Sequence, residues 1–405
     1  MKKSFLLIYL FLAVGFAFAQ KSSVKAVKDA LSESNLNYED ARARIKEALN
    51  DPEAISDPET WYVAGQLEDK IFSKESNKII LKQEPDYPVM YGALENSYGY
   101  FLKAIELEKI PDEKGKVKNK VTKQIKSILK INQVAYSESG AYYYNNAEYA
   151  KAYDAFGIFL AIPKLEMFQK EKLMPDSVYS QIKLYTAYAA TYDDEPKIPE
   201  AIAILEELKG KNYELTSVYQ TLAQNYRQAK DTVKYVATLK EGFNKFPNGR
   251  YFISSMIDFF IDSENIDEAL IYLDKAIELD PENPAYWSAK GDLYAAKDDP
   301  NQALTFFEEA LKIDSNFPRA IAGIGRTYYH QGLLLQRESN DQNSLKNPQQ
   351  VQKEINELYR KALPYLEKAH QAEPDNRQYI MALYGVYYAL EMPEVEKMEK
   401  LLGIE

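Results

Sequence analysis

The sequence repeats itself with a period of 34 residues, and this repeat limits the possible fold more than any other feature of the chain. Within one period, apolar residues follow one another at steps of three and four, which is the spacing of an amphipathic helix. Each period holds two such stretches around a short turn, so the pattern predicts a hairpin of two helices. A hairpin cannot bury its own apolar faces, and successive hairpins are therefore expected to stack. The repeating columns are Tyr185, Tyr219, Ile253 and Trp287; Ala189, Ala223, Ile257 and Gly291; Tyr192, Tyr226, Phe260 and Tyr294; Ala201, Tyr235, Ala269 and Ala303; Leu205, Leu239, Leu273 and Phe307; and Leu208, Gly242, Ala276 and Ala310.

One unit keeps this pattern best. It carries Trp287, Gly291, Tyr294, Ala303, Phe307 and Ala310 after Leu279, Asp280 and Pro281. The combination resembles the tetratricopeptide repeat family. The resemblance implies an all-α fold, a right-handed α-solenoid of helix-turn-helix repeats that covers residues 20–405. Its best repeats are expected at 182–317, degenerate or inserted repeats at 23–56, 58–111, 133–165 and 318–376, and a C-terminal capping hairpin at 377–405.

Three stretches interrupt the period, at about residues 73–92, 162–177 and 332–351. The first and third fall between the two helices of their hairpins. Each of them is expected either to lengthen the flanking helices or to form a loop. Residues 340–350 are rich in Asn, Gln and Ser, which is typical of a mobile loop.

The first 19 residues have the pattern of a secretory signal peptide. Lys2 and Lys3 precede an apolar stretch at 5–16, and a small-residue cleavage motif occupies 17–19. This stretch is shorter than the roughly 20 apolar residues that span a bilayer, so we expect cleavage after residue 19. The chain has no cysteine, which excludes disulfides and the usual lipid anchor of bacterial lipoproteins. We therefore expect a soluble protein of the periplasm, and association with the outer membrane stays open.

Few residues indicate catalysis. The chain has two histidines, His330 and His370, and it has neither a Gly-rich phosphate loop nor a serine elbow. The acid pairs at 193–194 and 298–299 fall at predicted turns, where solvated carboxylates are common. We therefore expect no enzyme, no cofactor and no metal site, although acid–base catalysis by carboxylates would leave no sequence signature. The formal charge of −11 also disfavours nucleic acid, which requires a basic surface.

The resemblance implies that the first helix of each hairpin lines an inner, concave groove where partners bind. Polar and aromatic residues occupy the solvent-facing positions of these helices, and such side chains suit an extended peptide. Ordinary solvated residues would give the same pattern. The predicted groove residues are Tyr144, Asn145, Gln220, Gln224, Arg227, Tyr251, Asp258, Asp292, Arg326 and Tyr329.

A second candidate surface is a lysine-rich stretch between residues 114 and 130. Apolar residues within it recur at helical spacing, which predicts an amphipathic helix with the lysines on its outer face. The face is either simply solvated or a docking patch for acidic partners and anionic lipid head groups, which would allow peripheral membrane contact. The lysines of this basic docking helix are Lys116, Lys118, Lys120, Lys123, Lys126 and Lys130.

These observations predict a non-catalytic scaffold or adaptor that binds envelope or outer-membrane-associated proteins through the concave groove. The alternative is a glycan-binding protein similar to the starch-binding outer-membrane capture proteins, because the chain contains 33 tyrosines that could present aromatic platforms. Two features count against this alternative: the lipid-anchoring cysteine is missing, and the sequence has no long loop-rich inserts. The oligomeric state and the pathway served do not follow from the sequence.

Overall fold

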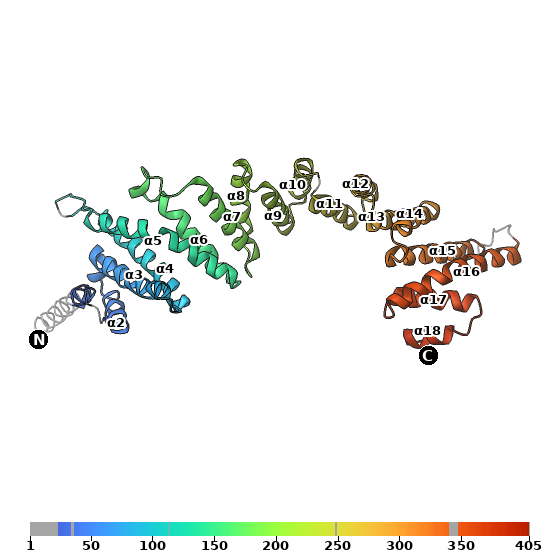
Figure 1. The fold of residues 1–405 in the computed structure, drawn as a ribbon, viewed down its shortest axis with the longest axis horizontal. Coiled ribbons are helices and arrows are strands. Elements are labelled where there is room, and N and C mark those ends of the chain that lie inside the picture. The colour runs from blue at the N-terminus through green and yellow to red at the C-terminus, as the bar shows by residue number, and fades with distance from the viewer. Residues whose placement is uncertain (1–22, 34–35, 113, 248, 340–346, 405) are drawn as a thin grey trace, which may run out of the picture. The chain divides into compact units, whose positions relative to one another are not determined.

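A computed structural model describes residues 23–33, 36–112, 114–247, 249–339 and 347–404. The expected signal peptide at 1–19 lies outside these residues. Throughout the described ranges the secondary structure is helical, without a strand, which confirms the all-α fold. No helix in them combines the length and apolar character needed to cross a membrane. The chain forms two compact units, one ending at Tyr235 and the other beginning at Val236. Figure 1 labels their helices and colours them from blue at the N-terminus to red at the C-terminus.

Unit 1 contains a series of antiparallel helix hairpins in which α3 pairs with α4, α5 with α6, and α7 with α8. Each hairpin also contacts the next one, because α4 packs on α5 and α6 on α7. The helices are α2 (Tyr38–Ala48), α3 (Pro58–Ile80), α4 (Tyr87–Glu108), α5 (Lys120–Asn145), α6 (Tyr149–Ala161), α7 (Asp176–Tyr192), α8 (Ile198–Gly210) and α9 (Leu215–Gln228), with short 3-10 turns at Ala54–Ser56, Ile162–Lys164 and Glu166–Phe168. Residues 23–30 are also helical.

Unit 2 continues the same construction, and the boundary between the units falls inside α10 (Thr232–Lys245). Here α11 pairs with α12, α13 with α14, α15 with α16, and α17 with α18. Their bounds are α11 (Arg250–Asp262), α12 (Ile266–Leu279), α13 (Pro284–Ala296), α14 (Pro300–Ile313), α15 (Pro318–Ser339), α16 (Pro348–Ala372), α17 (Arg377–Ala389) and α18 (Val395–Leu402).

The turns of hairpins α3/α4, α5/α6, α11/α12, α13/α14 and α17/α18, and the turn between α9 and α10, each contain one residue in a left-handed conformation. Lys230, Glu264 and Asp298 stand 34 residues apart and have φ angles of 58°, 57° and 56°. Each allows the backbone N–H of the following residue to hydrogen-bond to a carbonyl oxygen of the preceding helix. The Asn265 N–H, for example, donates a 2.8 Å bond to the Phe260 carbonyl oxygen. This is the usual way to end a helix and reverse the chain. The 34-residue period therefore repeats in the backbone as well as in the side chains.

Close contact within and between hairpins depends on glycines that face large aromatic rings. Phe307 of α14 is 1% exposed and lies between Gly291 of α13 and Gly323 of α15. A Cβ added at Gly291 would lie 2.7 Å from this ring, and one at Gly323 would lie 2.4 Å from it. Gly65 with Phe101 and Gly140 with Phe156 repeat the arrangement in unit 1. Small residues of the first helices thus receive the aromatic rings of the second helices.

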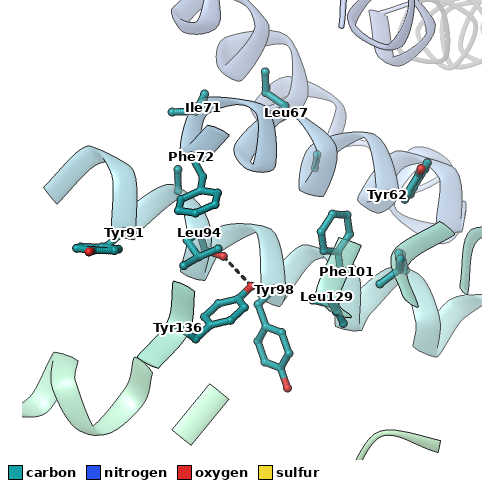
Figure 2. Packing of buried hydrophobic residues seen from close by; sticks show 14 of the residues in the cluster. Tyr62, Leu67, Ile71, Phe72, Tyr91, Leu94, Tyr98, Phe101, Leu129 and Tyr136 are labelled. Carbon is teal, nitrogen blue, oxygen red and sulfur yellow. Dashed lines mark hydrogen bonds between the residues drawn. The ribbon is translucent and has the colours of Figure 1, made fainter. Parts of the chain in front are cut away.

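The core of unit 1 is also rich in tyrosine. Figure 2 shows Tyr98 and Tyr136 beside Leu94, where the Tyr136 hydroxyl donates a 3.2 Å hydrogen bond to the Leu94 carbonyl oxygen. Tyr136 is fully buried and cannot hydrogen-bond to water, so this bond gives its hydroxyl the partner that it needs. Tyr136 therefore acts as a large packing residue whose hydroxyl has an internal partner, as the Tyr226 hydroxyl has in Glu206.

The first and third interruptions of the period lengthen the helices around them. Helices α3 and α4 are 23 and 22 residues long, and α15 and α16 are 22 and 25 residues long. The second interruption forms the two 3-10 turns after α6 and buries Phe168. Of the loop expected at 340–350, residues 340–346 lie outside the described ranges, while Pro348–Gln350 already belong to α16.

Candidate functional site

A cavity of about 880 Å³ in unit 2 is the best candidate for a binding site. Its walls come from α13, α15 and α17, with further contributions from α14 and the C-terminal end of the chain. The predicted groove residues Asp292, Arg326 and Tyr329 all line it, together with His330. The volume falls within the ~300–1,000 Å³ range of ligand pockets. We call it the α13/α15/α17 groove.

A charged cluster forms one side of this groove. The Asp292 carboxylate accepts a 2.6 Å hydrogen bond from Arg319 and a 3.1 Å hydrogen bond from Arg326. Asp292 and Arg326 stand 34 residues apart, so they occupy the same position in neighbouring repeats. Two guanidinium groups therefore share one carboxylate, and the cluster carries a net positive charge.

Apolar side chains form the rest of the groove. Leu333 of α15 is 39% exposed and Met381 of α17 is 56% exposed, although both are large and apolar. Leu334 and Ala382 extend the same lining. Exposed aliphatic surface beside a few polar groups is typical of a surface that another molecule covers.

The groove prediction omits every residue of α17 because residues 377–405 were expected only to cap the solenoid. Arg377 and Met381 lie one helical turn apart on α17 and line the groove. This spacing repeats that of Arg326 and His330 on α15, which could have indicated that the last hairpin contributes to the groove. The terminal hairpin is therefore part of the candidate site.

The remaining predicted groove residues of unit 2 lie on an earlier helix. Tyr251 and Asp258 are exposed on α11 and do not line the groove. Asp258 occupies the same position as Asp292 in the preceding repeat. The residue 34 positions after Asp258 is the acidic Asp292, whereas the residue 34 positions after Asp292 is Arg326, so Asp258 cannot form the equivalent ion pair.

The other predicted groove residues belong to unit 1. Tyr144 and Asn145 end α5, while Gln220, Gln224 and Arg227 lie on α9. The Tyr144 ring contacts Tyr149 at 5.4 Å and Tyr185 at 5.8 Å between centroids. Burial, followed by the charge of neighbouring tyrosines, raises the pKa of Tyr144 to about 12, so its hydroxyl stays protonated.

Further tyrosines of α7 extend this contact. Tyr185 and Tyr192 are exposed, and Tyr188 lies between them with ring contacts to both. We call Tyr144, Tyr149, Tyr185, Tyr188 and Tyr192 the tyrosine cluster. It offers flat aromatic surface with hydroxyl groups, which suits either a peptide or a sugar.

The structure corrects the extent of the basic docking helix. Helix α5 begins at Lys120, so Lys116 and Lys118 precede it instead of lying on it. The helix starts there because the Glu108 carboxylate accepts hydrogen bonds from the backbone N–H groups of Val121 at 2.8 Å and Thr122 at 2.6 Å.

Two of the lysines on α5 are already paired. Lys126 and Lys130 form ion pairs of 2.6 and 2.8 Å with Glu171, and these contacts lower the pKa of Glu171 to about 2. Lys120 and Lys123 are exposed. The positive charge of this face is therefore smaller than the count of lysines suggests.

Nothing in the described ranges resembles a metal centre, since no group of three His, Asp or Glu side chains converges there. The candidate site in this part of the chain is an apolar groove with an arginine-rich side.

Comparisons with known proteins agree with this architecture. A family model described as "Tetratricopeptide repeat" matches residues 258–283 and 284–317, which lie in α11–α14. No curated protein sequence matches the chain.

Several solved structures are similar to it. A repeat protein from Bacteroides fragilis is 18% identical, with 63% of this chain and 98% of that chain covered and a TM-score of 0.28. The C-terminal part of a repeat-containing protein from Cytophaga hutchinsonii is 13% identical, with 66% and 95% covered and a TM-score of 0.44. YrrB, described as a repeat protein with an unusual peptide-binding site, is 15% identical, with 50% and 92% covered and a TM-score of 0.35.

The matched residues contain the glycines, the aromatic rings and the left-handed turns that the other hairpins repeat. This is the construction of a fold that serves protein–protein interaction in general. With its 34-residue period, its stacked helix hairpins and the match at 258–317, the chain is a tetratricopeptide-repeat protein.

Proposed function

We propose that this protein is a non-catalytic adaptor that binds protein partners of the bacterial envelope, and that the α13/α15/α17 groove is a partner-binding site. One observation carries the proposal: Leu333 and Met381 expose aliphatic surface into the same cavity that holds the Asp292–Arg326 pair. Apolar contacts would supply affinity, and the charged side would select and orient the partner.

The cellular location is part of this proposal. The signal-like pattern of residues 1–19 supports export to the periplasm, where envelope or outer-membrane-associated proteins would be the available partners. Fractionation of cells that produce the full-length chain tests this point. Recovery of the chain in the cytoplasm, with residues 1–19 still attached, would contradict it.

Site-specific photo-cross-linking tests the binding site. A photoreactive amino acid replaces Met381 in the groove, and in a control variant it replaces Ile271 on α12, which is 49% exposed and does not line the groove. Both chains are produced in cells and irradiated, and cross-linked proteins are identified by mass spectrometry. We expect defined envelope proteins to be cross-linked from position 381 and not from position 271.

A second set of variants tests the charged side of the groove. Arg326→Ala combined with Tyr329→Ala removes two groove contacts while leaving the apolar lining, and the cross-links from position 381 are expected to weaken. Equal cross-linking from positions 381 and 271, or none from either, would refute this groove as a partner site.

Glycan binding is the second candidate, and the tyrosine cluster is the observation that favours it. Exposed Tyr185 and Tyr192 could stack on sugar rings, and their hydroxyls could hydrogen-bond to sugar hydroxyls. Calorimetric titration of the full chain with a panel of oligosaccharides tests this function. A heat signal that disappears in Tyr185→Ala and persists in Tyr388→Ala, an exposed tyrosine of unit 2, would support it, and a flat titration across the panel would remove it.

A further inference from the structure

We infer that the α13/α15/α17 groove accepts a short partner segment that presents at least two aliphatic side chains next to an acidic one, and that the C-terminal end of this chain forms a wall of that site. The inference rests on the proposed function, because it names the kind of segment that an adaptor of this type would bind.

The C-terminal wall is built by a helix-ending turn. Helix α18 is anchored by the buried Met398, and Gly403 follows it in a left-handed conformation with φ of 69°. The Ile404 N–H then bonds to the Glu399 carbonyl at 3.1 Å and the Gly403 N–H to the Lys400 carbonyl at 3.3 Å. These two bonds define a Schellman motif, which reverses the chain at that point. As a result Leu402 and Ile404 both line the groove.

Aliphatic side chains face this cavity from three directions. Leu333 belongs to α15, Met381 to α17, and Ile404, 51% exposed, to the C-terminal turn. Flexible side chains such as methionine and leucine adapt to the shape of what they bind. Since each of the three keeps much of its surface in water, a segment with two aliphatic side chains would bury apolar area against all of them.

The charge of the groove favours an acidic neighbour for these side chains. Arg326 is held by Asp292, but Arg377 at the start of α17 forms no ion pair with any residue that the structure describes. Asp298 is the other acid at the groove, and Arg319 adds a further cation beside Asp292. Arg319 does not line the groove itself, whose two arginines face two aspartates. Because Arg326 is already paired with Asp292, the local attraction comes from Arg377: a carboxylate beside it would be attracted, and a lysine there would be repelled.

The distribution of polar groups favours a peptide over an alkyl chain with one charged head. Gln378 and His330 line the groove on different helices, and Tyr384 adds a third polar side chain. A peptide offers a backbone N–H or carbonyl at every residue, so it could pair with groups at several points. A fatty acid has one polar end and would leave the other groups to compete for water.

Two substitutions with the same charge and nearly the same exposure test the C-terminal wall. Ile404→Asp places a carboxylate in the groove, whereas Leu401→Asp places one on α18 at a residue that is 50% exposed and does not line the groove. The probes are fluorescent synthetic peptide pools in which two leucines are fixed beside glutamate or beside lysine. Fluorescence anisotropy of the full chain, without residues 1–19, gives the Kd of each pool.

We expect the glutamate pool to bind more tightly than the lysine pool, and Ile404→Asp and Met381→Asp to raise its Kd at least about fivefold. Leu401→Asp should change it less than about twofold. Arg377→Gln should remove the difference between the two pools, because it removes the cation that distinguishes them.

Several outcomes would overturn the inference. These are equal binding of the two pools, equal losses from Ile404→Asp and Leu401→Asp, no binding of either pool, or saturable binding of sodium laurate with no binding of peptides. If photo-cross-links from position 381 persist while the glutamate pool does not bind, the inference fails and the adaptor function stands. If cross-links and peptide binding are both missing, the adaptor function fails with it.

Discussion

Glu95, on α4 in unit 1, should make the stability of this unit depend on pH. Its carboxylate is largely enclosed between α4, α5 and α6, and it accepts a 2.9 Å hydrogen bond from the Ser139 hydroxyl. Burial raises its pKa from 4.5 to about 7, and the bond from Ser139 opposes this shift. Of the charged groups of α6, Asp154 raises this pKa further and Lys151 lowers it.

The direction of the effect follows from proton linkage. An acid with a raised pKa holds its proton in the folded chain at pH values where the unfolded chain has lost it. Folding stability therefore falls as the pH rises from about 4.5 to about 7, and it is constant above that range. The full shift corresponds to about 3 kcal/mol. Because part of the side chain still contacts water, we reduce the expected loss to roughly 1–2 kcal/mol.

The test is Glu95→Gln, which keeps the shape and the bond from Ser139 but cannot ionise. The two tryptophans lie in different units, Trp61 in unit 1 and Trp287 in unit 2, so a Trp287→Phe background leaves Trp61 as the reporter of unit 1. Urea unfolding is followed by fluorescence at pH 5 and pH 8. We subtract the free energy of unfolding of the parent from that of Glu95→Gln at each pH. We expect this difference to be roughly 1–2 kcal/mol larger at pH 8 than at pH 5.

Glu106→Gln is the matched control, because Glu106 is exposed on the same helix. This substitution should leave the difference in unfolding free energy between pH 5 and pH 8 the same as in the parent. If Glu95→Gln behaves like this control, the buried carboxylate is not the source of the pH dependence, and the linkage argument is wrong.

Two further predictions concern the packing and the turns of the repeats. Gly323→Ala should destabilise unit 2 by about 1–3 kcal/mol, because its Cβ would lie 2.4 Å from the buried Phe307 ring; Gly157→Ala, which meets no atom within 4 Å, should not destabilise unit 1. Equal unfolding midpoints for Gly323→Ala and the parent, by Trp287 fluorescence, would contradict this close contact. Glu264→Gly should stabilise unit 2 by up to about 1 kcal/mol, since glycine adopts the φ of 57° without strain, and a lower midpoint in urea would refute that account of the turn.

Much of the fold follows from the sequence because a repeat protein is held together by contacts between neighbours. The spacing of Trp287, Gly291 and Tyr294 defines one helix face, and the second helix of the same hairpin supplies its partners, Phe306 and Phe307, only a few residues later in the chain. The all-α fold and the tetratricopeptide repeats were therefore predictable, and both are confirmed. The residue pattern left open whether the interruptions at 73–92 and 332–351 form loops or helix, because an amphipathic extension and a loop both tolerate polar residues there.

The binding surfaces depend on tertiary contacts that no repeat pattern contains. Lys130 is paired with Glu171, which is 41 residues away beyond a hairpin, so the sequence alone overstates the charge of α5. Ile404 reaches the groove only because Gly403 reverses the chain after α18. Sequence determined the hairpins, and the groove residues Asp292 and Arg326, because these follow the local 34-residue period, whereas the folded chain determined the rest of the groove because Met381 and Ile404 lie outside that period.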